Sequence, residues 1–215
     1  MSAAPDTFLL DLDGTLIDHF AVIHRTYAQT LEKLGRPPPT PEQVRAAVGG
    51  GLENAMRRFF PPEEIPVAMK IYREFWHAGL LDGVKLMPGA LELLQALRDR
   101  KAKLAVLTNK LGDSSRAICD YLKMTPLLEA VVGAQDTAWL KPQPELTAQV
   151  LARLGSSAGR AVMVGDSPFD VETAHQGGFP AWCVTTGTHD AAQLREARAD
   201  RIFADLDELR RFAAP

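Results

Sequence analysis

Two aspartates stand two residues apart at the end of the first apolar segment of the chain. Residues 8–17 read Phe-Leu-Leu-Asp-Leu-Asp-Gly-Thr-Leu-Ile and place carboxylates at Asp11 and Asp13. Side chains two positions apart on a strand point to the same side, and like charges held together are unfavourable unless a ligand uses them. A metal ion or a phosphoryl group is the ligand that this pair indicates, whereas the simplest alternative is a polar turn after a strand.

Further along the chain, three segments offer groups of complementary types: a hydroxyl with backbone donors, a cation, and additional carboxylates. These residues are Thr108 and Asn109 after an apolar segment, Lys141 before a proline, and Asp166 with Asp170 after another apolar segment. Each group alone has an ordinary explanation, as a strand end, a solvated lysine or a helix-start pair. Their convergence at one sheet edge favours a common site.

Short apolar segments recur along the chain, each bounded by turn residues. They cover residues 7–10, 103–107, 130–132, 161–164, 181–184 and 201–203. Runs of this kind are typical of strands buried on both faces of a parallel sheet. Helical patterns at 89–100, 145–154 and 190–197 alternate with them. We therefore predict an α/β fold with a doubly wound parallel sheet, in which ligands bind at the carboxyl ends of the strands.

One segment, residues 19–85, breaks this alternation. It shows helical patterns separated by proline and glycine, and Thr40-Pro41-Glu42-Gln43 predicts a helix start capped by Thr40. We predict a small all-helical cap domain here, with the α/β core formed by residues 1–18 and 86–215. Because the segment leaves the core after the first strand, it should overhang the carboxyl end of that strand, where ligands bind.

Together, these motifs resemble those of the haloacid dehalogenase-like hydrolases. Residues 11–16, Asp-Leu-Asp-Gly-Thr-Leu, followed by Asp18, are similar to the first motif of that family. Thr108-Asn109, Lys141-Pro142, and residues 165–167 with Asp170 are similar to the other three, in the family's order. The resemblance covers essentially the whole chain. It implies a Rossmann-like core, a helical cap after the first motif, and a phosphatase similar to phosphoglycolate phosphatase.

The resemblance also implies a role for each matching residue. Asp11 would be the nucleophile, which forms an aspartyl-phosphate, and Asp13 the general acid and base. A carboxylate at position 13 argues against dehalogenation, which has no leaving alkoxide to protonate. Phosphate would be bound by Thr108, Asn109 and Lys141, and Mg²⁺ by Asp11, Asp13 through its backbone carbonyl, Asp166 and Asp170. The implied partner is a small phosphorylated metabolite, either phosphoglycolate or a sugar phosphate.

The cap segment adds an indication of where the substrate binds. Residues 45–52 are similar to a cap stretch of phosphoglycolate phosphatases and β-phosphoglucomutases, in which an arginine and a glycine turn face the substrate. Arg45 and Gly49 are therefore predicted substrate contacts, although a plain turn between helices would also explain the glycines. Residues 19–85 hold slightly more basic than acidic residues, which would help to guide an anion inward.

Composition excludes several other classes of protein. The 215 residues are 46% hydrophobic and 24% charged with a net charge of −3, which is typical of a globular protein and gives no indication of nucleic acid as a partner. Two cysteines are too few for a disulfide framework, and no apolar segment suits a membrane span or a signal peptide. We expect a cytoplasmic protein with no membrane or nucleic-acid partner, whose oligomeric state the sequence leaves open.

Other functions remain compatible with the same residues. A phosphomutase of the β-phosphoglucomutase type would use the same groups but return the phosphoryl group to the substrate. A receiver-type signalling domain also phosphorylates an aspartate on a doubly wound sheet, although its acceptor follows a later strand and it has no helical cap. The remaining alternative is a non-catalytic acidic binding module.

Overall fold

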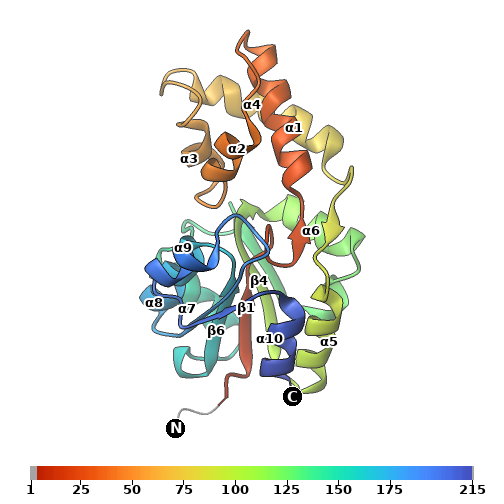
Figure 1. Cartoon of the computed structure of the whole chain (residues 1–215), viewed down its shortest axis with the longest axis vertical. Helices are drawn as coiled ribbons and strands as arrows, with labels where there is room; N and C mark the ends of the chain where they lie inside the picture. Colours follow the sequence, from red (N-terminus) through yellow and green to blue (C-terminus); the bar gives the residue numbers. More distant parts are fainter. Residues whose placement is uncertain (1–3, 215) are drawn as a thin grey trace.

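The computed structural model describes residues 4–214 and contains a parallel sheet of six strands (Figure 1). The strands are β1 (Thr7–Leu10), β4 (Lys103–Leu111), β5 (Ala130–Ala134), β6 (Ala161–Gly165), β7 (Ala181–Val184) and β8 (Arg201–Phe203). Their order in the sheet is β5-β4-β1-β6-β7-β8, and every neighbouring pair is parallel. The predicted α/β fold with a parallel sheet is confirmed, and β1 lies in its middle.

Helices cover both faces of this sheet. They are α5 (Ala90–Asp99), α6 (Gly112–Tyr121), α7 (Pro144–Arg153), α8 (Pro168–Gly177), α9 (Ala191–Glu196) and α10 (Leu206–Ala213), with two short 3-10 helices at Thr125–Leu127 and Ala158–Arg160. Phe8 of β1 packs in a buried cluster with Leu94 of α5, whereas Leu9 packs in another with Val150 of α7. Successive side chains of a strand point to opposite faces, so β1 is buried on both sides.

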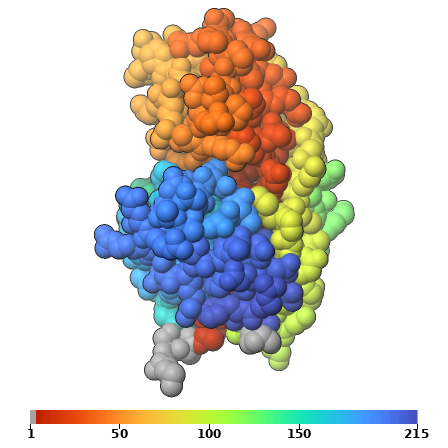
Figure 2. All heavy atoms as spheres, viewed as in Figure 1, coloured from red at the N-terminus to blue at the C-terminus, as the bar shows by residue number. Residues whose placement is uncertain are grey.

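Residues 20–79 form a separate group of helices, namely α1 (Phe20–Lys33), α2 (Pro41–Ala47), α3 (Leu52–Met56) and α4 (Ile65–Gly79). In Figures 1 and 2 they stand, in red to light orange, above the carboxyl end of β1. Tyr27 of α1, Met56 of α3 and Tyr72 of α4 belong to their common buried cluster. The predicted start of α2 is confirmed, because Thr40 Oγ1 accepts a hydrogen bond from the Gln43 N–H at 3.3 Å.

Some elements differ from the sequence prediction. The predicted end of the second core strand at residue 107 is wrong, because β4 continues to Leu111 and contains Thr108 and Asn109. Because these two side chains are polar, the apolar segment ends before the strand does. Also missed were β2 (Ile17–Asp18) and β3 (Lys85–Leu86), an antiparallel pair at the two ends of the helical segment. Strands of two residues are too short to show a periodic pattern.

No helix in the described part of the chain, residues 4–214, is both long and apolar enough to cross a membrane.

The packing of α5 against the sheet yields a stability prediction. Leu94 is fully buried, so truncation to alanine leaves a cavity, and we expect Leu94→Ala to lower the free energy of unfolding by about 2–5 kcal/mol in urea denaturation. Glu92→Ala, on the exposed side of the same helix, is the matched control and should change it by less than about 0.5 kcal/mol. Equal effects of the two substitutions would contradict this packing.

Candidate active site

Asp11 lies directly after β1, at the carboxyl edge of the sheet. Its backbone N–H donates to the carbonyl oxygen of Val164 at 2.8 Å, which continues the pairing of β1 with β6. Its carboxylate oxygen Oδ1 accepts a hydrogen bond from Lys141 Nζ at 2.7 Å. Both side chains are buried, with exposed fractions of 8% for Asp11 and 5% for Lys141. The sheet therefore holds an ion pair at the point where β1 ends.

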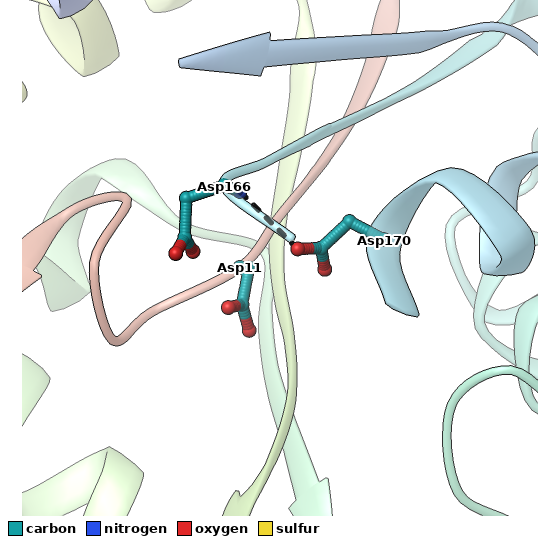
Figure 3. Close-up of side chains that lie close together, drawn as sticks. All are labelled: Asp11, Asp166 and Asp170. Carbon is teal, nitrogen blue, oxygen red and sulfur yellow. Dashed lines mark hydrogen bonds between the residues drawn. The ribbon is translucent and has the colours of Figure 1, made fainter. Parts of the chain in front are cut away.

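Three carboxylates meet at this edge, from Asp11, Asp166 after β6 and Asp170 in the first turn of α8 (Figure 3). One oxygen of each lies within 4.8 Å of the others. Burial raises the pKa of Asp11 to about 6, against the opposing effect of Lys141, and burial together with Asp170 raises the pKa of Asp166 to about 8. Mg²⁺ prefers oxygen ligands of this kind, and a cation would offset the repulsion between them. The donor set therefore fits a hard divalent cation.

Asp170 differs from the other two because hydrogen-bond donors of the protein already surround it. Its Oδ1 accepts from Lys141 Nζ at 2.7 Å. Its Oδ2 accepts from Ser167 Oγ at 2.6 Å and from the backbone N–H groups of Ser167 and Asp166 at 3.1 and 3.2 Å. Asp170 therefore holds both Lys141 and the turn between β6 and α8.

Asp166 is held by two hydroxyl-bearing residues that the sequence analysis did not single out. Thr15 Oγ1 donates to its Oδ1 at 3.1 Å, and the N–H of Thr188 donates to its Oδ2 at 3.0 Å. Gly14 has a φ of +84°, and a Cβ there would lie 2.7 Å from Asp166 Oδ2. The turn after β1 therefore requires glycine at this position, both for its conformation and for the close approach of Asp166.

The side chain of Asp13 stands apart from the three carboxylates. Its two oxygens accept from Lys110 Nζ at 2.9 and 2.8 Å, and Lys110 Nζ lies 4.5 Å from the centre of the Trp76 ring of α4. His19 Nδ1 lies 3.8 Å from Asp13 Oδ1. Burial lowers the pKa of His19 to about 4, so this imidazole is neutral at pH 7. Lys110, which packs on the Trp76 ring, therefore holds the carboxylate of Asp13, the predicted general acid and base.

Thr108 and Asn109 are both buried near the end of β4. The side-chain nitrogen of Asn109 donates to the carbonyl oxygens of Gly49 and Lys141 at 3.0 and 3.1 Å. Its side-chain oxygen accepts from the N–H of Lys141 at 2.8 Å. The Asn109 side chain, predicted to bind phosphate, thus bonds to backbone groups and joins the glycine turn of the helical segment to the Lys141 turn.

A cavity of about 480 Å³ lies between these core residues and the helices α1–α4. The core side contributes Asp11, Asp13, Thr108, Asn109, Lys110, Asp166 and Thr188, among others. Gly49, a predicted substrate contact, lines the cavity with its neighbours Gly50 and Gly51. Most of the core residues predicted for chemistry therefore face one cavity, whereas Lys141 and Asp170 are not among its described lining residues.

Arg45, the other predicted substrate contact, is not among the lining residues that the structure describes. It is exposed, and its guanidinium lies 3.9 Å from the centre of the Phe20 ring. The arginine that does line the cavity is Arg73 of α4. The sequence did not indicate Arg73, because the periodicity of one helix does not reveal which of its residues face the α/β core across the cavity.

Known proteins resemble this chain over most of its length. The family model described as haloacid dehalogenase-like hydrolase matches residues 8–184. A phosphoglycolate phosphatase of Caulobacter vibrioides is 33% identical over 207 residues, which cover 93% of this chain and 85% of that protein. The probable phosphatase IndB of Dickeya dadantii is 30% identical and covers 94% and 90%.

A solved structure agrees with these sequence relatives. The crystal structure of a predicted phosphatase from Clostridium acetobutylicum is 27% identical, covers 98% of both chains and matches with a TM-score of 0.89. Family model, relatives and fold thus agree over the segments that carry the site. The chain therefore belongs to the haloacid dehalogenase-like hydrolases and is an enzyme of their phosphatase type, similar to phosphoglycolate phosphatases.

Proposed function

We propose that this enzyme hydrolyses the phosphate ester of a small metabolite, phosphoglycolate or a sugar phosphate, with Mg²⁺ and through an aspartyl-phosphate on Asp11. The observation that carries the proposal is that Asp11, which lines the cavity, accepts a hydrogen bond from the buried Lys141 Nζ at 2.7 Å. The names of the relatives support the type of substrate. Residues 19–85 would act as the cap of a core made of residues 1–18 and 86–215, in a cytoplasmic protein.

Positive charge at the phosphoryl site is the first requirement of this reaction. A carboxylate that attacks a phosphate dianion is repelled by it, so the site must neutralise the phosphoryl oxygens. Burial by itself lowers the pKa of Lys141, but Asp11 and Asp170 outweigh this effect and hold that pKa above its usual value. Lys141 is therefore a cation at neutral pH, and Thr108, which lines the cavity, offers a hydroxyl. Asp11, Asp166 and Asp170 would hold Mg²⁺, which would supply further positive charge for this neutralisation.

Asp11 and Asp13 then carry out two successive steps. A carboxylate oxygen of Asp11 forms a bond to phosphorus while the bond from phosphorus to the leaving oxygen breaks, and Asp13 donates its proton to that oxygen. As a carboxylate, Asp13 next takes a proton from the water that attacks the aspartyl-phosphate. This second step breaks the bond between Asp11 and phosphorus and releases inorganic phosphate. Lys110 positions Asp13, because it binds both of its oxygens.

Replacement of the nucleophile tests the covalent route. Asp11→Asn keeps the size of the side chain but removes the attacking carboxylate, so we expect loss of essentially all Mg²⁺-dependent phosphate release from phosphoglycolate, with an unchanged circular dichroism spectrum. Asp99→Asn, a change at an exposed aspartate of α5, should retain wild-type rates. An active Asp11→Asn enzyme would contradict the aspartyl-phosphate, and bisphosphate-dependent isomerisation by the wild type with little phosphate release would favour a phosphomutase instead.

Replacement of Asp13 tests the proton transfer. Asp13→Asn cannot donate to the leaving oxygen or accept from water, and we expect kcat to fall about a hundredfold or more. Esters with a good leaving group, such as p-nitrophenyl phosphate, need less protonation in the first step. Their rate of aspartyl-phosphate formation, measured in a rapid-mixing experiment, should therefore fall less than that of an alkyl phosphate. Wild-type turnover of both esters would show that another group transfers the proton.

The carboxylate cluster predicts how Mg²⁺ affects stability. A ligand at a hundred times its Kd stabilises the folded state by about 2.7 kcal/mol, so Mg²⁺ should raise the melting temperature of the wild type. Asp166→Asn should lose most of this rise, because it removes one of the three carboxylates that would hold the cation. Asp99→Asn, at an exposed position of α5, is the control and should respond as the wild type does. A wild type that is indifferent to Mg²⁺ would contradict the site.

A further inference from the structure

Arg73 of α4 faces the cavity from the side of the helical segment. Met69, Arg73 and Trp76 all line the cavity, and they are spaced four and three residues apart. This spacing places them on one face of the helix, and Trp76 Nε1 on that face donates to Ser114 Oγ of the core at 3.0 Å. The face that carries Arg73 is therefore the one turned towards the site.

Arg73 has no carboxylate partner among residues 4–214, as is also true of Arg45 and Arg58, but of these three only Arg73 lines the cavity. Such partners are present in the pairs Arg25–Asp82, Arg36–Glu64 and Arg57–Glu53. A guanidinium remains charged at any physiological pH, and an ion in partly buried surroundings is stabilised by an anion. Arg73 is half-buried, with aromatic and aliphatic lining residues on either side of it on α4.

The two lysines of the core at this site are engaged in ion pairs, in contrast to Arg73. Lys141 Nζ binds Asp11 and Asp170, and Lys110 Nζ binds Asp13. Of the cavity-lining residues that the structure describes, Arg73 is the one cation that the segment 19–85 contributes. A phosphoryl group bound at Asp11 would leave the opposite end of a substrate facing the helices, where Arg73 lies.

We infer that Arg73 determines specificity by binding a second anionic group, a carboxylate or another phosphate, at the end of the substrate away from the transferred phosphoryl group. The inference rests on the proposed function only for the position of the phosphoryl group. The planar guanidinium offers two parallel donors that match either anion. A cavity of about 480 Å³ has the size of a small-ligand site. Arg73 thus takes the role that the sequence predicted for Arg45.

Binding of unreactive phosphonates tests this inference without any turnover. Phosphonopropionate carries a carboxylate at the far end, propylphosphonate lacks it, and propane bisphosphonate carries a second phosphonate there. We expect Arg73→Gln, in the presence of Mg²⁺, to weaken phosphonopropionate or the bisphosphonate about tenfold or more in titration calorimetry, which is the effect of one lost charge-assisted contact. Its affinity for propylphosphonate should stay within about twofold of the wild type. The ligand that loses more affinity identifies the second anion.

Two further variants serve as controls, and circular dichroism checks the fold of each. Lys70→Gln removes a positive charge from an exposed position of the same helix and should bind all three ligands as the wild type does. Arg73→Lys keeps the charge and should retain part of the preference. Equal weakening of all three ligands by Arg73→Gln, or no weakening of any, would overturn the inference.

Steady-state kinetics distinguish a failure of this inference from a failure of the proposed function. With phosphoglycolate and ethyl phosphate as a matched pair, Arg73→Gln should raise KM for phosphoglycolate about tenfold, leave kcat nearly unchanged, and leave KM for ethyl phosphate nearly unchanged. A wild type that binds the phosphonates through Arg73 but releases no phosphate from either ester would contradict the hydrolase mechanism and support the role of Arg73. Turnover of both esters that does not depend on Arg73 would support the hydrolase mechanism and contradict the role of Arg73.

Discussion

One buried lysine between two carboxylates is the interaction on which the site depends. Lys141 Nζ lies 2.7 Å from Asp11 Oδ1 and 2.7 Å from Asp170 Oδ1, and all three residues are buried. Removal of one partner from a buried ion pair typically costs about 3–5 kcal/mol, because it leaves an uncompensated charge. The three residues follow β1, β5 and β6 in the chain, so their contact also fixes how these separate strand ends are arranged.

This arrangement leaves more negative than positive charge at the sheet edge. Lys141 balances one carboxylate, whereas three have oxygens within 4.8 Å of one another. Burial raises the pKa values of Asp11 and Asp166, and the neighbouring carboxylates raise them further. Such crowding lowers the stability of the folded chain and is retained where a ligand uses it. The core therefore has the electrostatics of a cation site, and a cation there would complete the neutralisation that a phosphate dianion requires.

The sequence predicted the sheet and the residues at its edge because both leave local signals, apolar runs of strand length and polar residues after them. The same signals could have revealed two missed residues: Lys110 lies two positions after Thr108, on the same side of an extended strand, and Thr188 follows β7. Arg45 and Arg73 could not be told apart in this way. Which residues of the helical segment face the α/β core depends on how the four helices pack on one another. A periodic pattern within one helix does not contain that information.

The helical segment touches the groups that carry the chemistry, and this contact links recognition to reaction. Asn109 joins the carbonyl oxygen of Gly49 to the turn of Lys141, and the Trp76 ring packs on the ammonium group that binds Asp13. A movement of the helices away from the sheet would break these contacts and expose the site more fully to water. Electrostatic interactions are stronger where water is excluded, so Lys141 acts most strongly on a phosphoryl group when the helices are in place. A substrate that also binds the helices would stabilise this closed arrangement, and its binding at the far end would thereby assist the reaction at Asp11.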